Sequence, residues 1–214
     1  MALNEFGMSR TVNTLENGVI CFANDTLIAT MSGQRPVQSL QAGEKIITRD
    51  NGLQEIAWIG SKHLDASALA QQSNLRPVLI KAGALGNNMP ERDIMVSPNH
   101  RMLIANDITS LLFDERETLV AAKHLVGKDG VEIAAVAETT YHHILFENHE
   151  VVLGNGAWSE SFQPGDYSMG TLENEQRAEI FTLFPDLKAQ GALQDYAAAR
   201  RSLSKKEAAL LHAH

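Results

Sequence analysis

Residues 21–30 read Cys-Phe-Ala-Asn-Asp-Thr-Leu-Ile-Ala-Thr, and here the chain changes from a polar leader to β-type sequence. The β-branched residues in the second half of the stretch predict a strand over residues 26–30. Cys21, which opens the stretch, is the only cysteine of the chain. A lone thiol ahead of a strand is a small buried apolar residue, a redox or metal-binding thiol, or a nucleophile.

The composition is that of a folded globular protein. Of the 214 residues, 44% are hydrophobic and 21% are charged, which allows a sizeable core and argues against disorder. The net charge of −8 argues against a general nucleic-acid binder, which would carry a basic stripe. A single cysteine excludes an internal disulfide and a cysteine-rich zinc site, and we expect no cofactor.

Neither a secretion signal nor a membrane span is visible in the sequence. Residues 1–17 are mixed and polar, without the apolar centre of a Sec-type signal peptide. No stretch approaches the roughly 18 apolar residues that a membrane helix needs. We therefore expect a soluble protein that is cytoplasmic or is secreted without a leader.

Short strands separated by turn residues fill most of the chain. Strand-like sequence is found at residues 26–30, 44–48, 77–80, 93–96, 101–104, 118–120, 131–133, 141–146 and 151–153. Asp50-Asn51-Gly52 predicts a tight hairpin with a return strand over residues 53–59, and the polar residues 61–76 predict a surface insertion. The pattern predicts an all-β domain, barrel-like or built from several sheets.

Helical signals replace the strand pattern after Pro164-Gly165-Asp166. Thr171 is a suitable N-cap for one helix, and Ser204 with Glu207 forms a capping box for another. We therefore expect three parts: a leader of residues 1–20, a β domain of residues 21–165 and a helical tail of residues 166–214.

Two downstream segments carry groups suited to act on Cys21. Ser97-Pro98-Asn99-His100 places a hydroxyl and an imidazole ahead of a strand, and residues 141–156 run from a tyrosine through three histidines to Asn155-Gly156. In this order the three segments resemble the Hint (Hedgehog/intein) autoprocessing domain. The chain is most similar to the bacterial Hint-type group in which the Hint core continues into a helical tail. Further matches lie at residues 37–44, 58–60, 76–78, 82–86, 160–162, 183–185 and 202–203.

The resemblance implies a mainly β fold, a Hint-type horseshoe of short strands with a small helical C-terminal appendage. It also implies an N-to-S acyl shift, in which the Cys21 sulfur attacks the carbonyl of Ile20 and a thioester replaces the amide. His100 is then the acid that protonates the departing nitrogen, and Ser97 polarises the peptide or orients His100. The N-terminal segment would be its own substrate, with water or a small nucleophile as acyl acceptor.

The histidines of the third segment extend this expected site. His142 stands where inteins carry an acid that assists the cysteine, so it would act as a base or, as an imidazolium, lower the pKa of the Cys21 thiol. His142 and His143 alternate across a strand, so at most one of them faces the site. We expect His142 to face it, and His149 to act in support or in a later step.

Three departures from the family narrow the expected chemistry. Inteins that splice end in His-Asn, whereas Ala-Trp-Ser-Glu follows Gly156 here. Hedgehog proteins use an aspartate to activate a sterol, and the matching residues 59–62 contain none. Asp25 stands where glycine is usual, which bears on the turn behind Cys21. Autocatalytic N-terminal cleavage, without splicing or sterol transfer, is what these differences leave.

Two other interpretations stay open. A Hint scaffold without activity would serve as a binding or structural module, and the short leader favours this because twenty residues are a small cargo. A hydrolase acting on other molecules would need an open cleft at Cys21. The sequence does not indicate the oligomeric state.

Overall fold

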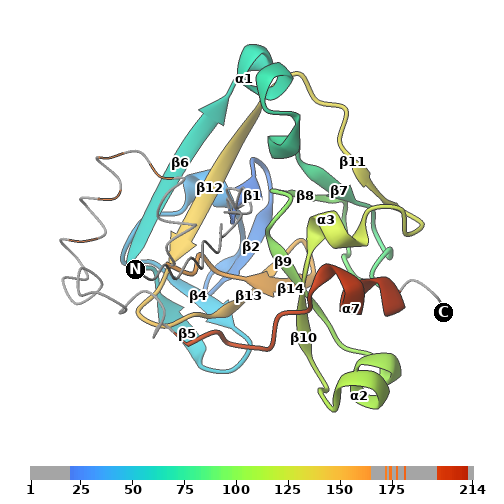
Figure 1. The fold of residues 1–214 in the computed structure, drawn as a ribbon. Helices are drawn as coiled ribbons and strands as arrows, with labels where there is room; N and C mark the ends of the chain where they lie inside the picture. Colours follow the sequence, from blue (N-terminus) through green and yellow to red (C-terminus); the bar gives the residue numbers. More distant parts are fainter. Residues whose placement is uncertain are drawn as a thin grey trace, which may run out of the picture.

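Fourteen short strands form two sheets in this computed structural model, which describes residues 20–164, 172, 174, 177, 181 and 197–211 (Figure 1). The mainly β fold is as the sequence predicts. The smaller sheet has six strands in the order β11-β7-β8-β1-β12-β6. They are β1 (Phe22–Ala23), β6 (Trp58–Leu64), β7 (Val78–Ile80), β8 (Ile94–Val96), β11 (Val131–Ile133) and β12 (Thr139–Leu145).

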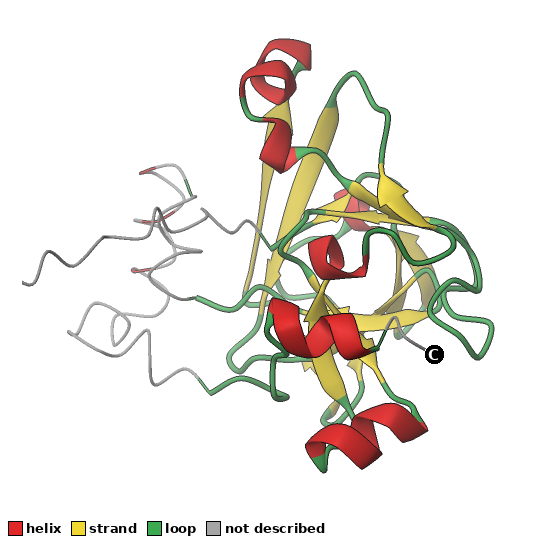
Figure 2. Ribbon diagram, turned by 45° about the vertical axis from the view of Figure 1, so that its right-hand side comes forward, coloured by secondary structure: helices red, strands yellow, loops and turns green. Residues whose placement is uncertain are grey.

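The larger sheet has eight strands, in the order β10-β9-β14-β13-β2-β4-β5 with β3 paired to β2. They are β2 (Leu27–Thr30), β3 (Gly33–Pro36), β4 (Lys45–Thr48), β5 (Gly52–Glu55), β9 (Arg101–Ile104), β10 (Thr118–Ala121), β13 (Val151–Gly154) and β14 (Ala157–Glu160). The described helical segments are η1 (Val37–Ser39), α1 (Ala66–Gln71), η2 (Ser73–Leu75), α2 (Asp107–Phe113), α3 (Ala122–Leu125) and α7 (Lys205–Leu210). β6 and β12 form a long ribbon that carries α1 at its far end (Figure 2).

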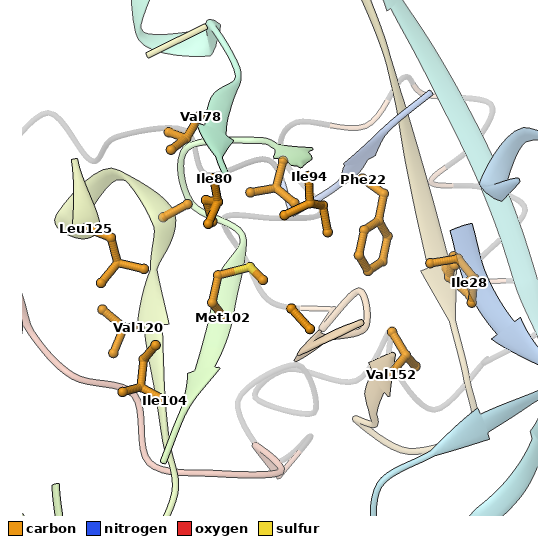
Figure 3. Close-up of a cluster of buried hydrophobic side chains, with 14 of the residues drawn as sticks. Phe22, Ile28, Val78, Ile80, Ile94, Met102, Ile104, Val120, Leu125 and Val152 are labelled. Carbon is orange, nitrogen blue, oxygen red and sulfur yellow. The ribbon is translucent and has the colours of Figure 1, made fainter. Parts of the chain in front are cut away.

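Apolar side chains from both sheets meet in one core (Figure 3). Phe22 of β1 lies in this core beside Ile28 of β2 and Val152 of β13, and its side chain is 2% exposed. Full burial of a side chain of this size stabilises the fold by about 2–3 kcal/mol. Because Phe22 follows Cys21 directly, the core fixes the backbone on one side of the Ile20–Cys21 bond.

The central part of the sequence folds differently from the prediction in one respect. The hairpin at Asp50-Asn51-Gly52 is confirmed, since Thr48 pairs with Gly52. The single return strand over residues 53–59 is wrong, because β5 ends at Glu55 and β6 begins at Trp58 in the other sheet. β6 also continues to Leu64, so the expected surface insertion begins too early. Residues 61–63 are polar and partly or fully exposed on this ribbon, which hides the strand from a hydrophobicity pattern.

Asp25 adopts the backbone conformation that the usual glycine would supply. Its φ is 66°, in the left-handed region that aspartate tolerates better than most residues. Gln38 stabilises this turn, because its side-chain oxygen accepts from the Asp25 N–H at 2.9 Å and its amide donates to the Asp25 carboxylate at 2.6 Å. The turn behind Cys21 is therefore kept despite the substitution.

The described part of the tail joins the main domain closely. The N–H of Leu119 donates to Arg201, and the N–H of Leu203 donates back to Leu119, both at 2.9 Å. The predicted capping box at Ser204 and Glu207 is confirmed at the start of α7. α7 buries Ala208 in the main core together with Leu203 and contacts α3. Residues 1–19 of the predicted leader 1–20, and the predicted helix starting at Thr171, lie outside the described residues, apart from single positions of the helix.

Candidate functional site

Cys21 lies immediately before β1 and is held from one side by Ser97. The Cys21 N–H donates to Ser97 Oγ at 2.9 Å, and the Ser97 N–H donates to the Cys21 carbonyl at 3.0 Å. This clamp extends the pairing of β1 with β8, in which Phe22 lies opposite Val96. The Cys21 side chain is 1% exposed, so both the thiol and the peptide on its N-terminal side are enclosed.

His143, on β12, faces Cys21 from the other side. Its Nδ1 and Nε2 lie 3.3 and 3.4 Å from Cys21 Sγ. Its Nδ1 is also 3.0 Å from the carbonyl oxygen of Ile20, the group that the sulfur would attack. The tautomer with its proton on Nδ1 donates to Ile20 and leaves Nε2 free to accept the thiol proton. We call Cys21, Ser97, His143 and the Ile20 carbonyl the Cys21 site.

The register of two strands decides which histidine reaches the thiol. Phe22 of β1 lies opposite His142 of β12, so these two side chains share a face. Cys21 and His143, one step along each strand, share the other face. The structure therefore places His143 at the sulfur, whereas the sequence favoured His142. His142 Nε2 instead lies 2.5 Å from Asn24 Oδ1.

His100 occupies the turn that starts at Ser97. Its N–H donates to the Ser97 carbonyl at 3.0 Å, and its ring meets the Phe22 ring edge-on at a centroid distance of 4.5 Å. The side chain is 1% exposed, and neither ring nitrogen has a hydrogen-bond partner. A buried polar group without a partner costs about 1–3 kcal/mol, so this imidazole is kept in place at the expense of stability.

Burial keeps the Cys21 site uncharged. It raises the pKa of the Cys21 thiol well above its usual range, against smaller opposing effects of Ser97 and Lys62. It lowers the pKa of His143 to about 4, although the hydrogen bond to Ile20 acts in the opposite direction. It likewise lowers the pKa of His100 to about 4. Around neutral pH the resting Cys21 site therefore holds a thiol and the neutral imidazole of His143, and His100 is neutral as well.

Aromatic side chains form the wall that excludes water from His143. The Phe162 ring meets the His143 ring edge-on at 5.0 Å, and the Trp58 ring lies 6.2 Å away. Ile20 is 7% exposed and packs in the same cluster as Trp58 and Phe162. This apolar wall is the physical cause of the low pKa of His143.

His149 belongs to a different group of side chains. It is 5% exposed, accepts a hydrogen bond on Nδ1 from the N–H of Ala199 at 3.0 Å, and points Nε2 toward Glu160. Of the predicted site residues, the structure thus places Ser97 in contact with Cys21 and His100 in the turn that starts at Ser97. His143, which was not among the predicted site residues, also contacts Cys21. His142 and His149 have other partners. The sequence signal for His143 is the alternation of side chains along its strand. Alternation does not give the register between this strand and β1.

No cluster of three or more histidine, cysteine or acidic side chains in the described ranges is arranged to hold a metal ion. Among the pockets lined by described residues are two of about 170 and 200 Å³, and Cys21 lines neither of these two. None of the helices in the part of the chain described here has the length and apolar character needed to cross a bilayer.

Residues 20–166 match the sequence profile of the Hint domain family. The chain belongs to the Hint domain family. A bacterial intein-like domain from Clostridium thermocellum is similar at 13% identity and a TM-score of 0.43, over 68% of this chain and 100% of that one. A DnaB intein from Synechocystis is similar at 12% identity and a TM-score of 0.43, over 66% and 98% of the two chains. A comparison with curated proteins found no match.

Proposed function

We propose that this Hint domain performs an N-to-S acyl shift at Ile20–Cys21 and then releases its N-terminal segment, without splicing. The family supports a self-processing domain in general. The observation that carries the specific proposal is the position of His143 Nδ1, which lies 3.3 Å from the Cys21 sulfur and 3.0 Å from the Ile20 carbonyl oxygen. One side chain thus contacts both the nucleophile and the group under attack.

The first step moves one proton from sulfur to nitrogen. Cys21 Sγ gives its proton to His143 and bonds to the Ile20 carbonyl carbon, and the Nδ1–H of His143 stabilises the developing oxyanion. The proton then passes from His143 through the site or solvent to His100, which delivers it to the amide nitrogen of Cys21 as the carbon–nitrogen bond breaks. The product is a thioester with a free α-amine, and both imidazoles are neutral again.

The shifted pKa values of the Cys21 thiol and of His143 suit this proton transfer. Because the thiol pKa is raised, little thiolate is present at neutral pH, and a base must take the proton during attack. His143, with a pKa of about 4, is neutral and can accept it. The reactive form, a thiolate with an imidazolium, contains the same number of protons as the resting form. The rate should therefore change little between about pH 5 and 8.

In the second step, water or a small nucleophile attacks the thioester. The acyl group of Ile20 passes to the acceptor, and the sulfur leaves as the Cys21 thiolate and is then protonated. Nothing further along the chain is needed, which agrees with the absence of a terminal His-Asn pair after Gly156.

The second candidate is an inactive Hint scaffold that serves as a binding or structural module. The enclosure of the site favours it, because Cys21 is 1% exposed and Ile20 is 7% exposed. An acceptor reaches a thioester there only if the wall around it opens. A hydrolase for foreign substrates is less well supported, since it would need an open cleft and Cys21 is 1% exposed.

Intact-mass analysis of the purified chain tests the proposal. Incubation with dithiothreitol or hydroxylamine should release residues 1–20, because either reagent attacks a thioester. The Cys21→Ala variant should stay whole, whereas Cys21→Ser would form an ester that hydroxylamine cleaves and the thiol does not. If the wild type remains intact with every nucleophile between pH 5 and 9, the inactive scaffold is correct.

A further inference from the structure

A buried charged group is bonded to Arg101, the residue that follows His100. Glu160, at the end of β14, has a fully buried side chain, and its carboxylate accepts from the Arg101 N–H at 2.8 Å and from the Arg101 guanidinium at 3.0 Å. His149 Nε2 lies 3.4 Å from the same carboxylate, close enough for attraction but not aligned as a hydrogen bond. We call Glu160, Arg101, His149 and the Ala199 N–H the Glu160 network.

We propose that Glu160 is a positioning residue that acts through His100, by supplying the buried negative charge that lets His100 carry the proton for the departing amide nitrogen. This inference rests on the proposed acyl shift. Arg101, which holds Glu160, is the residue directly after His100, so the network and the turn of His100 share one stretch of backbone.

The charged and titratable groups around His100 favour this role for Glu160. Burial is the main cause of the low pKa of His100, and Glu160 opposes it, whereas Arg101 and His149 reinforce it. His143 also interacts electrostatically with His100, whereas Phe22 meets the His100 ring with an uncharged ring. Glu160 is the one negative charge acting on His100 among these groups.

The C-terminal tail determines which ring nitrogen of a neutral His149 carries the proton in the Glu160 network. The Ala199 N–H donates to His149 Nδ1, so a neutral His149 carries its proton on Nε2, the atom that faces Glu160. Arg200 then anchors Ala199, because its guanidinium contacts Asp50 at 2.6 Å and Glu117 at 2.8 Å. The tail therefore places the Nε2 proton of a neutral His149 opposite the Glu160 carboxylate.

The tail also supports the turn of His100 by a second route. α7 contacts α3, and α3 donates backbone hydrogen bonds to that turn, from Ala122 to the His100 carbonyl at 2.9 Å and from Lys123 to the Pro98 carbonyl at 2.8 Å. A segment far along the chain thus holds both the backbone of His100 and the charge beside it.

NMR titration of the His100 ring in the full-length Cys21→Ala protein tests the coupling without requiring activity. Replacing Glu160 by Gln removes the charge at nearly constant shape and should lower the His100 midpoint by about one pH unit, so that the ring stays neutral down to pH 4. Replacing Arg101 by Gln should shift the midpoint upward by a similar amount. The opposite signs separate an electrostatic role from general loosening, which would move both midpoints toward the ordinary value.

Glu150→Gln is the matched control, since Glu150 is also a buried carboxylate, is 2% exposed, and is bonded to Asn51 instead. It should leave the His100 midpoint unchanged. An unchanged midpoint in Glu160→Gln, or an equal shift in Glu150→Gln, would overturn the inference. If Glu160→Gln does not fold, Glu160→Met also removes the charge at similar size, and the direction of its shift decides: downward for an electrostatic role, upward for general loosening.

The same substitutions in the cysteine-containing protein connect the coupling to the reaction. Glu160→Gln should slow thiol-induced cleavage about tenfold at pH 7, and Glu150→Gln should leave the rate unchanged. If cleavage is equally fast in Glu160→Gln despite a shifted midpoint, the positioning role is wrong and the acyl shift stands. A wild type that never cleaves removes the proposed function, and the coupling is then judged on the titration alone.

Discussion

The Cys21 site and the Glu160 network are both buried, but one holds neutral groups and the other holds charges. The Cys21 site brings together a thiol, a hydroxyl and an imidazole, and burial shifts the pKa of its thiol and of His143 toward their neutral forms. The Glu160 network contains a carboxylate with an arginine bonded to it. A buried charge is tolerated only with such partners, whereas a neutral group can be left ready to react.

His100 is connected to both regions. Its N–H donates to the Ser97 carbonyl at 3.0 Å, and its ring nitrogens have no hydrogen-bond partner. Charges of the Glu160 network act on its ring. The comparison therefore assigns bond making to the Cys21 site and the control of one proton to the Glu160 network, a division that substitutions can test.

The largest effect should come from His143→Ala. This change removes the base for the thiol and the donor to the Ile20 carbonyl together. Each such contribution is typically worth about 10²- to 10³-fold, so cleavage in dithiothreitol should slow at least about 10³-fold. The measurement is the rate of release of residues 1–20 by intact mass at pH 7.

The neighbouring histidines provide the controls. His142→Ala loses the contact with Asn24 and should leave the cleavage rate within about threefold of the wild type, because His142 does not face the sulfur. His149→Gln belongs to the Glu160 network and should fall between the two. Equal losses in His142→Ala and His143→Ala would show that the sequence-based choice of His142 has as much merit as the structural one.

Much of the fold could be predicted from the sequence because its turns carry local signals. Asp50-Asn51-Gly52 forces a hairpin by itself, and Ser204 with Glu207 caps α7 through contacts only three residues apart. β6 was missed in part because its partner, β12, is some eighty residues away and its polar side chains are exposed. A strand whose only reason to form is a distant partner leaves little pattern in its own residues.

Some residues of the candidate site could likewise be predicted from local sequence, and others could not. Cys21, Ser97 and His100 were identified because they lie in short motifs whose order along the chain resembles a family. The choice between His142 and His143 depends on a one-residue register between β1 and β12, and alternation alone cannot supply it. The sequence covers Glu160 only by the family match at residues 160–162 and assigns it no role, because the fold alone brings Arg101 and His149 to it.

Acid should lower the free energy of unfolding, because two buried histidines are uncharged in the folded protein. The pKa values of His100 and His143 are both about 4 in the folded protein, against about 6.5 in an unfolded chain. The unfolded state binds more protons between these values, so the stabilisation from the neutral rings is complete above pH 6.5 and is lost as the pH falls to 4. Each ring accounts for about 3 kcal/mol of this loss.

Urea unfolding of Cys21→Ala at several pH values measures that loss. His100→Leu in the same background should remove roughly half of the pH dependence, because leucine has no proton to bind. It should also raise stability at pH 4, since it replaces a buried imidazole whose nitrogens have no partner. A pH dependence that is unchanged in His100→Leu would assign the acid sensitivity to other groups.

Among the residues of the Cys21 site, Ser97→Ala should have the smallest effect, because that serine would position the peptide and take no proton. Alanine removes the acceptor of the Cys21 N–H and leaves the second half of the clamp, in which the backbone N–H of residue 97 donates to the Cys21 carbonyl at 3.0 Å. A misplaced scissile bond should slow cleavage about 10- to 100-fold. Ser97→Thr keeps the hydroxyl and should retain most of the rate. If alanine and threonine variants cleave equally fast, the backbone half of the clamp suffices, and the side chain of Ser97 belongs with the residues that only support the fold.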